Sequence, residues 1–165
     1  MEQYVVIGPS SQALGLSIAR KLNATPIGCE FKTFPDNECY LRYDIQDDNI
    51  LKGADLIIVH STGANSYGDQ NKRFMELFMM ISIARRCEAA KIRVIVPYFA
   101  YSRQDKVFRP GESIFAAELC RLIQASGATE FYSVDMHAPA VFNMFSIPAY
   151  NINPMQSLAN YVKEK

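Results

Sequence analysis

The sequence lacks several features that mark particular classes of protein. Its 17 basic and 17 acidic residues cancel, which leaves no electrostatic case for binding nucleic acid or an anionic membrane surface. No apolar run approaches the roughly 20 residues that span a membrane, and no charged-then-apolar leader opens the chain. The four cysteines (Cys29, Cys39, Cys87 and Cys120) are far apart and form no C-x-x-C, as is typical of reduced cytosolic thiols. We therefore expect a cytoplasmic protein with no nucleic-acid or membrane partner.

The common nucleotide-binding and catalytic motifs are also missing. There is no G-x-x-x-x-G-K-[ST], and the glycine at Gly8 is followed by Pro-Ser-Ser rather than by the pattern G-x-G-x-x-G. No Ser-His-Asp or Cys-His spacing stands out, and no set of zinc ligands is present. A nucleotide bound by this chain must therefore be held through loops at strand ends and through metal.

Strand and helix patterns alternate along the 165 residues, which are enough for one α/β domain with a real core. The spacing of apolar residues predicts strands at 4–7, 27–31, 40–45, 56–60, 92–97 and 131–134. It predicts helices at 12–22, 71–88, 113–126 and 155–163, the last beginning after Asn153-Pro154. The order favours a three-layer, doubly wound, mainly parallel sheet with helices on both faces.

The loop after the strand at 92–97 is the most informative part of the chain. Here an apolar run gives way within a few positions to Arg103, Gln104, Asp105 and Lys106. In open α/β sheets, ligands bind at the carboxyl ends of the strands. Arginine can bind phosphate oxygens with two parallel hydrogen bonds, and lysine adds a point charge. The pattern favours an anionic, metal-bound ligand over the alternative, a solvated charged loop that continues through Arg109.

A second polar group, Asp135 and His137, follows the strand predicted at 131–134. Adjacent strand ends converge in space, so these side chains are candidates for the same site. They could ligate Mg²⁺ or orient a metal-bound phosphate, although imidazole is an unusual ligand for so hard a cation. The alternative is a histidine that only caps a strand end.

A third candidate is the stretch Phe34-Pro35-Asp36-Asn37-Glu38, which lies between two predicted strands. Pro-Asp-Asn is turn chemistry, so a type I turn with no further role is the alternative interpretation.

Several strings, taken in order, resemble the ribose-phosphate pyrophosphokinases, also called PRPP synthetases. Pro97 to Lys106, Pro-Tyr-Phe-Ala-Tyr-Ser-Arg-Gln-Asp-Lys, is similar to the family signature P-Y-F-x-Y-[AS]-R-Q-D-K. The helical string at 74–80 and Asn-Ile-Asn-Pro at 151–154 also match, and residues 106–112 look most like archaeal-type members. Departures include Phe115 where the family usually has Ser, and His60 where it more often has Gln, so we interpret His60 as structural.

The resemblance implies a phosphoribosyltransferase-like fold and transfer of the diphosphoryl group of Mg-ATP to O1 of ribose 5-phosphate, giving PRPP and AMP. It also implies Mg²⁺, ATP, ribose 5-phosphate and a homo-oligomer with shared sites. The resemblance further implies that ATP is bound by six residues: Phe34, Asp36, Glu38, Arg103, Gln104 and Asp105. His137 would help to fix the metal, and the supporting residues are Asp135, Lys106 and Arg109.

Members of this family are about twice as long, and the chain resembles their amino-terminal half. We expect residues 1–155 to form the ATP-site and oligomerisation domain, and 156–165 to begin a helix leading to a carboxyl-terminal domain. The acidic phosphoribose loop, D-D-x-x-x-T-G-G-T, is missing, so we expect no catalytic residue in this half and no activity of the chain alone. Two alternatives are a non-catalytic regulatory or scaffold relative that needs a partner, and a free-standing nucleotide-binding or phosphoribosyltransferase-like module.

Overall fold

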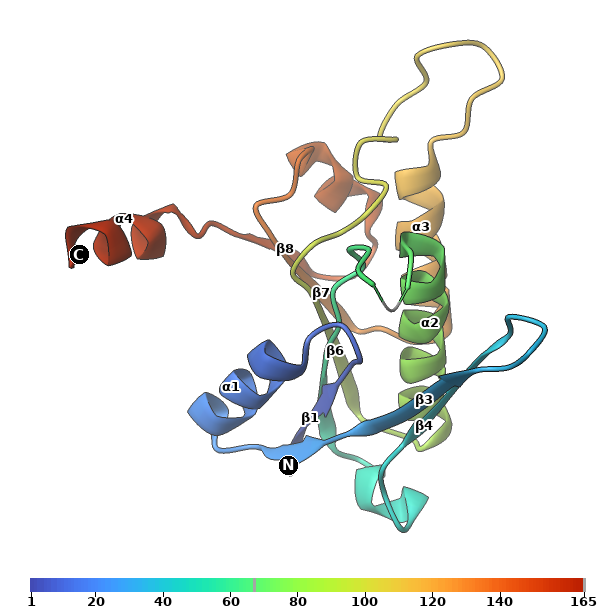
Figure 1. Cartoon of the computed structure of the whole chain (residues 1–165), viewed down its shortest axis with the longest axis vertical. Helices are drawn as coiled ribbons and strands as arrows, with labels where there is room; N and C mark the ends of the chain where they lie inside the picture. Colours follow the sequence, from blue (N-terminus) through green and yellow to red (C-terminus); the bar gives the residue numbers. More distant parts are fainter. Residues whose placement is uncertain (67, 165) are drawn as a thin grey trace.

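A six-stranded parallel sheet forms the centre of the computed structural model, which describes residues 1–66 and 68–164 (Figure 1). The strands lie in the order β2-β1-β5-β6-β7-β8, and every neighbouring pair is parallel. Their bounds are β1 Gln3–Ile7, β2 Thr25–Ile27, β5 Asp55–Val59, β6 Lys91–Val96, β7 Glu130–Val134 and β8 Ala149–Ile152. The mainly parallel sheet predicted from the sequence is confirmed.

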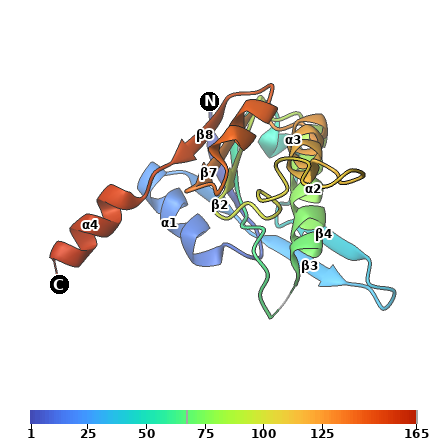
Figure 2. The ribbon, with the colours of Figure 1, turned by 90° about the horizontal axis from the view of Figure 1, so that it is seen from above.

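Helices cover both faces of this sheet (Figure 2). Helix α1, Gln12–Leu22, lies on one face, and α2, Gln70–Arg86, and α3, Phe115–Ser126, lie on the other. Side chains alternate along β1, where Val5 and Ile7 join the smaller core under α1 and Val6 joins the larger core under α2 and α3. The three-layer arrangement is therefore confirmed.

Residues 25–43 differ from the prediction. We predicted one strand at 27–31, but the structure divides this region at Gly28. Strand β2 stays in the parallel sheet, whereas β3, Cys29–Thr33, pairs antiparallel with β4, Cys39–Tyr43, in a separate two-stranded sheet. This β3–β4 hairpin packs along α2, where Lys72 Nζ donates to Thr33 Oγ1 over 2.7 Å.

The edge strand β8 was not predicted at all. Its residues, Ala-Tyr-Asn-Ile, are half-buried or exposed, because an edge strand has one neighbour and needs no continuous apolar run. Short 3₁₀ helices at Asp48–Leu51 and Pro139–Met144 were also not predicted.

Helix α4, Met155–Lys163, begins and ends where the sequence predicts, and it extends away from the rest of the domain (Figure 1). None of its residues is buried. No helix in the described part of the chain is both long and apolar enough to cross a membrane.

The sheet topology places the loops that matter for function at one edge. The loops β1–α1, β5–α2, β6–α3 and the one after β7 all leave from the carboxyl ends of neighbouring strands. This is the edge at which open α/β sheets bind ligands.

Candidate functional site

A small cavity of about 150 Å³ opens at the carboxyl ends of β6 and β7. The start of the β6–α3 loop contributes Tyr98, Ser102 and Arg103, and the end of β7 contributes Asp135 and His137. The structure therefore brings together three residues that the sequence predicted in two separate strings.

Arg103 supplies the positive charge of this cavity. Its side chain is exposed, and within residues 1–66 and 68–164 it forms no ion pair with a carboxylate. An exposed guanidinium with no acidic partner is suited to an anion such as phosphate, which it can bind with two parallel hydrogen bonds.

The backbone around the cavity adopts an uncommon conformation at two positions. Tyr101 has a φ of 63° and Asp135 a φ of 46°, both in the left-handed region that non-glycine residues enter at a cost of about 1–2 kcal/mol. The ring of Tyr101 is fixed between Phe74 and Phe115, with ring centroids 5.9 and 5.0 Å away. Such strain is found preferentially at functional sites.

Asp135 and His137 are both exposed at the end of β7. The described residues contain no group of three or more His, Cys, Asp or Glu side chains that could hold a metal ion by themselves. Of these two side chains, the carboxylate is the kind of ligand that Mg²⁺ prefers, usually together with substrate phosphates, whereas the imidazole is an unusual one.

The rest of the β6–α3 loop extends beyond the cavity, as the yellow segment at the top of Figure 1. Gln104 and Lys106 line a separate hollow with Phe108 and Glu112. Glu112 Oε2 accepts hydrogen bonds from the amides of Phe108 (2.8 Å) and Arg109 (2.9 Å), which closes the turn at the tip. Asp105, which is half-buried, lines neither hollow.

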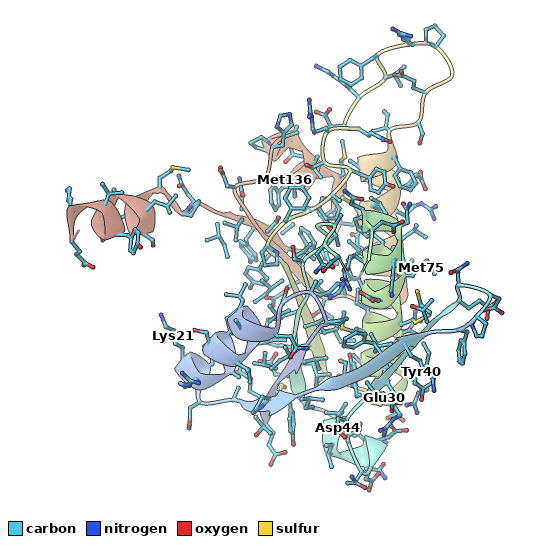
Figure 3. The ribbon with its side chains drawn as sticks, viewed as in Figure 1. Lys21, Glu30, Tyr40, Asp44, Met75 and Met136 are labelled. Carbon is cyan, nitrogen blue, oxygen red and sulfur yellow. The ribbon has the colours of Figure 1, made fainter. Side chains whose placement is uncertain are left out.

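The predicted turn at 34–38 forms the tip of the β3–β4 hairpin. The amide of Phe34 donates to the carbonyl of Glu38 over 2.8 Å, and Asp36 Oδ1 accepts from the Glu38 amide over 3.1 Å. Figure 3 shows Tyr40 of this hairpin beside α2, on the side of Met75, whereas Met136 lies beneath the extended loop at the cavity. The structure therefore does not bring Phe34, Asp36 and Glu38 to the cavity of their own chain.

A larger hollow lies elsewhere, along the outer side of α2. It measures about 790 Å³ and is lined by Leu41 of the hairpin and by Met75, Phe78 and Met79 of α2, among others. Its walls are mostly apolar, and none of the residues predicted from the sequence lines it. We therefore place the candidate site at the smaller, charged cavity.

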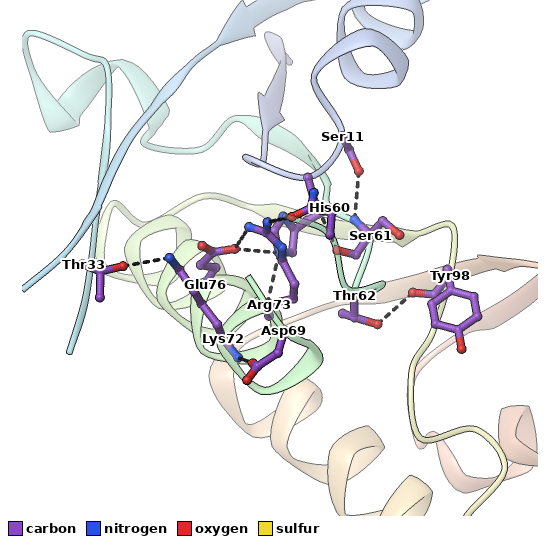
Figure 4. Close-up of polar contacts among 12 residues, drawn as sticks. Ser11, Thr33, His60, Ser61, Thr62, Asp69, Lys72, Arg73, Glu76 and Tyr98 are labelled. Atoms are coloured by element: carbon purple, nitrogen blue, oxygen red, sulfur yellow. Dashed lines mark hydrogen bonds and ion pairs between the residues drawn. The ribbon is translucent and has the colours of Figure 1, made fainter. Parts of the chain in front are cut away.

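Beneath this edge lies a buried polar cluster that sequence reasoning missed (Figure 4). Arg73 and Glu76 of α2 are each 1% exposed, and Arg73 Nη1 donates to Glu76 Oε2 over 2.7 Å. His60, at the end of β5, is fully buried and donates from Nε2 to the carbonyl of Arg73 over 3.0 Å. Burial lowers the pKa of His60 to about 3, so its ring is neutral at pH 7. The interpretation of His60 as structural is confirmed.

Two further residues, one that lines the cavity and one that bonds to the backbone of its wall, were not predicted as site residues. Tyr98 follows β6 after a single proline, lines the cavity and is 58% exposed. Thr62, in the β5–α2 loop, is fully buried and bonds to the backbone on both sides of Phe99. The position of Tyr98 just after a buried strand could have indicated a site residue, whereas nothing in the sequence distinguishes Thr62 from any other loop threonine.

Known proteins match the chain over nearly its whole length. A family described as "N-terminal domain of ribose phosphate pyrophosphokinase" matches residues 4–127. The chain is 38% identical to the ribose-phosphate pyrophosphokinase of Methanobrevibacter smithii, over 98% of this chain and 51% of the relative. It is 36% identical to the protein of the same name from Methanosarcina acetivorans, over 96% of this chain and 50% of the relative.

The fold also matches a solved structure, that of phosphoribosylpyrophosphate synthetase from Mycobacterium smegmatis. The TM-score is 0.86 at 26% sequence identity, and the match covers 99% of this chain and 52% of that chain. The chain thus spans about half the length of the curated relatives it matches, and archaeal proteins are among them.

Proposed function

Because the chain belongs to the ribose-phosphate pyrophosphokinase family, as its amino-terminal domain, we propose that it supplies the Mg-ATP half of that enzyme. The resemblance found in the sequence motifs, including the likeness to archaeal members, is thereby confirmed. The proposed reaction transfers the diphosphoryl group of ATP to O1 of ribose 5-phosphate, giving PRPP and AMP. The O1 hydroxyl attacks the β-phosphorus in line, and catalysis rests on positioning and on neutralisation of charge.

The observation that carries the proposal is the cavity that Arg103, Asp135 and His137 line together. In this assignment the Arg103 guanidinium binds phosphate oxygens of ATP, with Gln104 and Asp105 beside it. Lys106 and Arg109, farther along the same loop, add positive charge near the phosphates. Arg103 is exposed and has no acidic partner among the residues that the structure describes, which supports this role because its charge is available to a ligand.

We assign Mg²⁺ to the same cavity, held by His137 and oriented by Asp135. The donor set fits a metal that enters with ATP rather than a resident one, because two side chains leave most coordination positions to phosphate and water. When bound, the metal supplies neutralisation of charge on the transferring phosphoryl groups.

We further propose that the site is shared in a homo-oligomer. Phe34, Asp36 and Glu38 lie at the hairpin tip, which extends away from the cavity of its own chain (Figure 1). Reaching the cavity of a second copy would let Phe34 stack on adenine while the two carboxylates accept hydrogen bonds from the base or ribose. Phe34 is 41% exposed, so its ring is available for such stacking.

Intersubunit sharing has a specific test. Phe34→Ala and Arg103→Gln chains are each expected to bind Mg-ATP poorly alone. Mixed together, they should regain a fraction of the sites, because some sites then combine an intact Arg103 with an intact Phe34 from the other chain. No recovery after mixing and reassociation would contradict a shared site.

The acceptor, ribose 5-phosphate, is assigned to a carboxyl-terminal half of the kind that the relatives carry. The chain spans 51% and 50% of the two relatives described above, and it contains no D-D-x-x-x-T-G-G-T. These relatives are named as the enzyme itself, so nothing in them favours the regulatory alternative.

The experiment that tests the function is AMP release from Mg-ATP and ribose 5-phosphate. The purified chain alone is expected to be silent, and addition of the carboxyl-terminal half of the Methanobrevibacter smithii relative is expected to produce AMP. The Arg103→Gln chain, treated identically, should stay silent in both cases. Turnover by the chain alone would contradict the assignment of the acceptor site, and silence of the combined halves would contradict the proposed reaction.

A further inference from the structure

Thr62 joins two loops at the candidate site through a single hydroxyl group. Its Oγ1 donates to the carbonyl of Tyr98 and accepts from the amide of Ala100, both over 2.8 Å. Its own amide also donates to the Tyr98 carbonyl over 3.0 Å. Thr62 therefore continues the pairing of β5 with β6 past the edge of the sheet, into the loop that carries Arg103.

The segment before Thr62 is itself anchored. The Ser61 amide donates to Ser11 Oγ over 2.8 Å, and Ser10 Oγ lies 2.6 Å from the Ser61 carbonyl and 3.0 Å from His60 Nδ1. Figure 4 shows the bond between Ser11 and Ser61 beside Thr62. Position 8 has room only for glycine, because an added Cβ would lie 2.3 Å from His60 Nδ1.

The segment after Thr62 is held from the other side by the buried ion pair. Arg73 Nη2 donates to Asn65 Oδ1 over 2.6 Å, while Nη1 is bonded to Glu76. The β5–α2 loop is thus fixed to β1–α1 on one side and to α2 on the other. Thr62 lies between these two anchors, so its hydroxyl offers a rigid point of attachment.

The attachment acts close to the predicted phosphate-binding side chain. Ala100 lies three positions before Arg103, and Tyr101, directly after it, has the left-handed φ of 63°. A strained turn persists only where its surroundings fix it on both sides. The bond from Ala100 to Thr62 fixes one side, and the Tyr101 ring against Phe74 and Phe115 fixes the other.

We propose that Thr62 is a positioning residue for nucleotide binding: its hydroxyl holds the Tyr98–Ala100 backbone so that Arg103 faces the cavity beside Asp135 and His137. The inference rests on the proposed function, because the ligand is Mg-ATP. It goes beyond that function in assigning a role to a buried loop residue that does not itself contact the ligand.

The chain offers a matched control, Thr129, whose contacts are at the opposite end of β6. Thr129 Oγ1 also bonds twice to the backbone of β6, accepting from the Ile92 amide over 3.0 Å and donating to the Ile92 carbonyl over 3.1 Å. Thr129 lies at the amino end of β6, away from the cavity. The two threonines therefore make the same kind of contact, and only one of them is next to the site.

The experiment measures the Kd of Mg-ATP for the full chain by calorimetry, with the melting temperature of each variant as a record of folding. Thr62→Val keeps the shape and removes the hydroxyl, and Thr62→Ser keeps the hydroxyl. We expect Thr62→Val to weaken binding about tenfold, Thr62→Ser to bind like the unmodified chain, and Thr129→Val to lose thermal stability without change in Kd. In an Arg103→Gln background, Thr62→Val should cause no further loss, because its effect acts through Arg103.

The outcomes separate the two proposals. No binding by the unmodified chain overturns the proposed nucleotide site and, with it, the role of Thr62. Binding that Thr62→Val leaves unchanged, or weakens equally with and without Arg103, overturns the positioning role alone. If Thr62→Val does not fold, the Kd of Mg-ATP is measured instead for Ser10→Ala, with Arg103 intact and in the Arg103→Gln background. The expected result is again a loss of affinity that disappears in the Arg103→Gln background.

Discussion

The buried pair of Arg73 and Glu76 offers a sharp test of how the candidate site is supported. Glu76→Gln keeps the shape of the side chain and removes its charge, so the Arg73 guanidinium remains buried without a counter-charge. Removing one partner of a buried ion pair typically costs about 3–5 kcal/mol. The side chains here are 1% and 2% exposed, so solvent cannot compensate.

A matched control lies on the next helix. Glu118 and Arg121 have the same spacing of three residues, but their side chains are 47% and 66% exposed. Exposed pairs contribute at most about 1 kcal/mol, so Glu118→Gln should change stability little. The two substitutions are chemically identical and differ only in burial.

The assay is urea unfolding followed by circular dichroism. With an m-value of about 2 kcal/mol/M, we expect the midpoint of Glu76→Gln to fall by about 2 M and that of Glu118→Gln by less than 0.5 M (about a quarter of the shift). Replacing both Arg73 and Glu76 by methionine should recover much of the loss, because no lone charge is then buried. Arg73 Nε and Glu76 Oε1 have no hydrogen-bond partner among the described residues, which also favours recovery.

Two results would refute this reasoning. One is an equally small loss of stability in Glu76→Gln and Glu118→Gln, which would mean that Arg73 reaches solvent. The other is a double methionine variant less stable than Glu76→Gln, which would mean that the charges themselves stabilise the fold.

Three further predictions follow from the same edge of the sheet. Burial lowers the pKa of His60 to about 3, so between pH 6.5 and 3 the unfolded chain binds a proton that the folded chain does not, and stability falls as the pH falls through this range. Urea unfolding at several pH values measures this dependence of the free energy of unfolding on pH, which for one proton is up to about 1.4 kcal/mol per pH unit. His60→Gln should lose this contribution, whereas His137→Gln should keep it. Gly8→Ala should be destabilised by at least about 2 kcal/mol in thermal unfolding, because the new Cβ would lie 2.3 Å from His60 Nδ1, whereas Gly28→Ala meets nothing closer than 4.0 Å; equal melting temperatures would contradict the contact. Calorimetry with and without Mg²⁺ should show that His137→Ala removes most of the Mg²⁺-dependent part of ATP binding, and an unchanged dependence would exclude its metal role.

Much of the sheet could be predicted from the sequence because its central strands are buried on both faces. Strand β5 is buried at every position, and after Asp55 at its start it appears in the sequence as a continuous apolar run. The edge strand β8 has no such run. It joins the sheet only because the chain, after leaving β7, returns and runs parallel to β7. The division at Gly28 was missed because Ile27, Cys29 and Phe31 alternate with Gly28 and Glu30, which is the pattern of a single strand.

The candidate site was predictable to the extent that it depends on strand ends. Arg103, Asp135 and His137 come together because β6 and β7 are parallel neighbours. The pair of Arg73 and Glu76 was missed because a charged pair three residues apart on a helix is usually exposed, as Glu118 and Arg121 are. Only the tertiary packing of α2 under the loops distinguishes the buried pair from the exposed one.

The most direct test of the account is a crystal structure of the chain with Mg²⁺ and a non-hydrolysable ATP analogue. We expect the phosphates in the cavity at the ends of β6 and β7, with Arg103 bonded to phosphate oxygens and the metal beside Asp135 and His137. Phosphate density in the apolar hollow along α2, or anywhere away from Arg103, would contradict the central claim that the nucleotide binds at the carboxyl ends of β6 and β7.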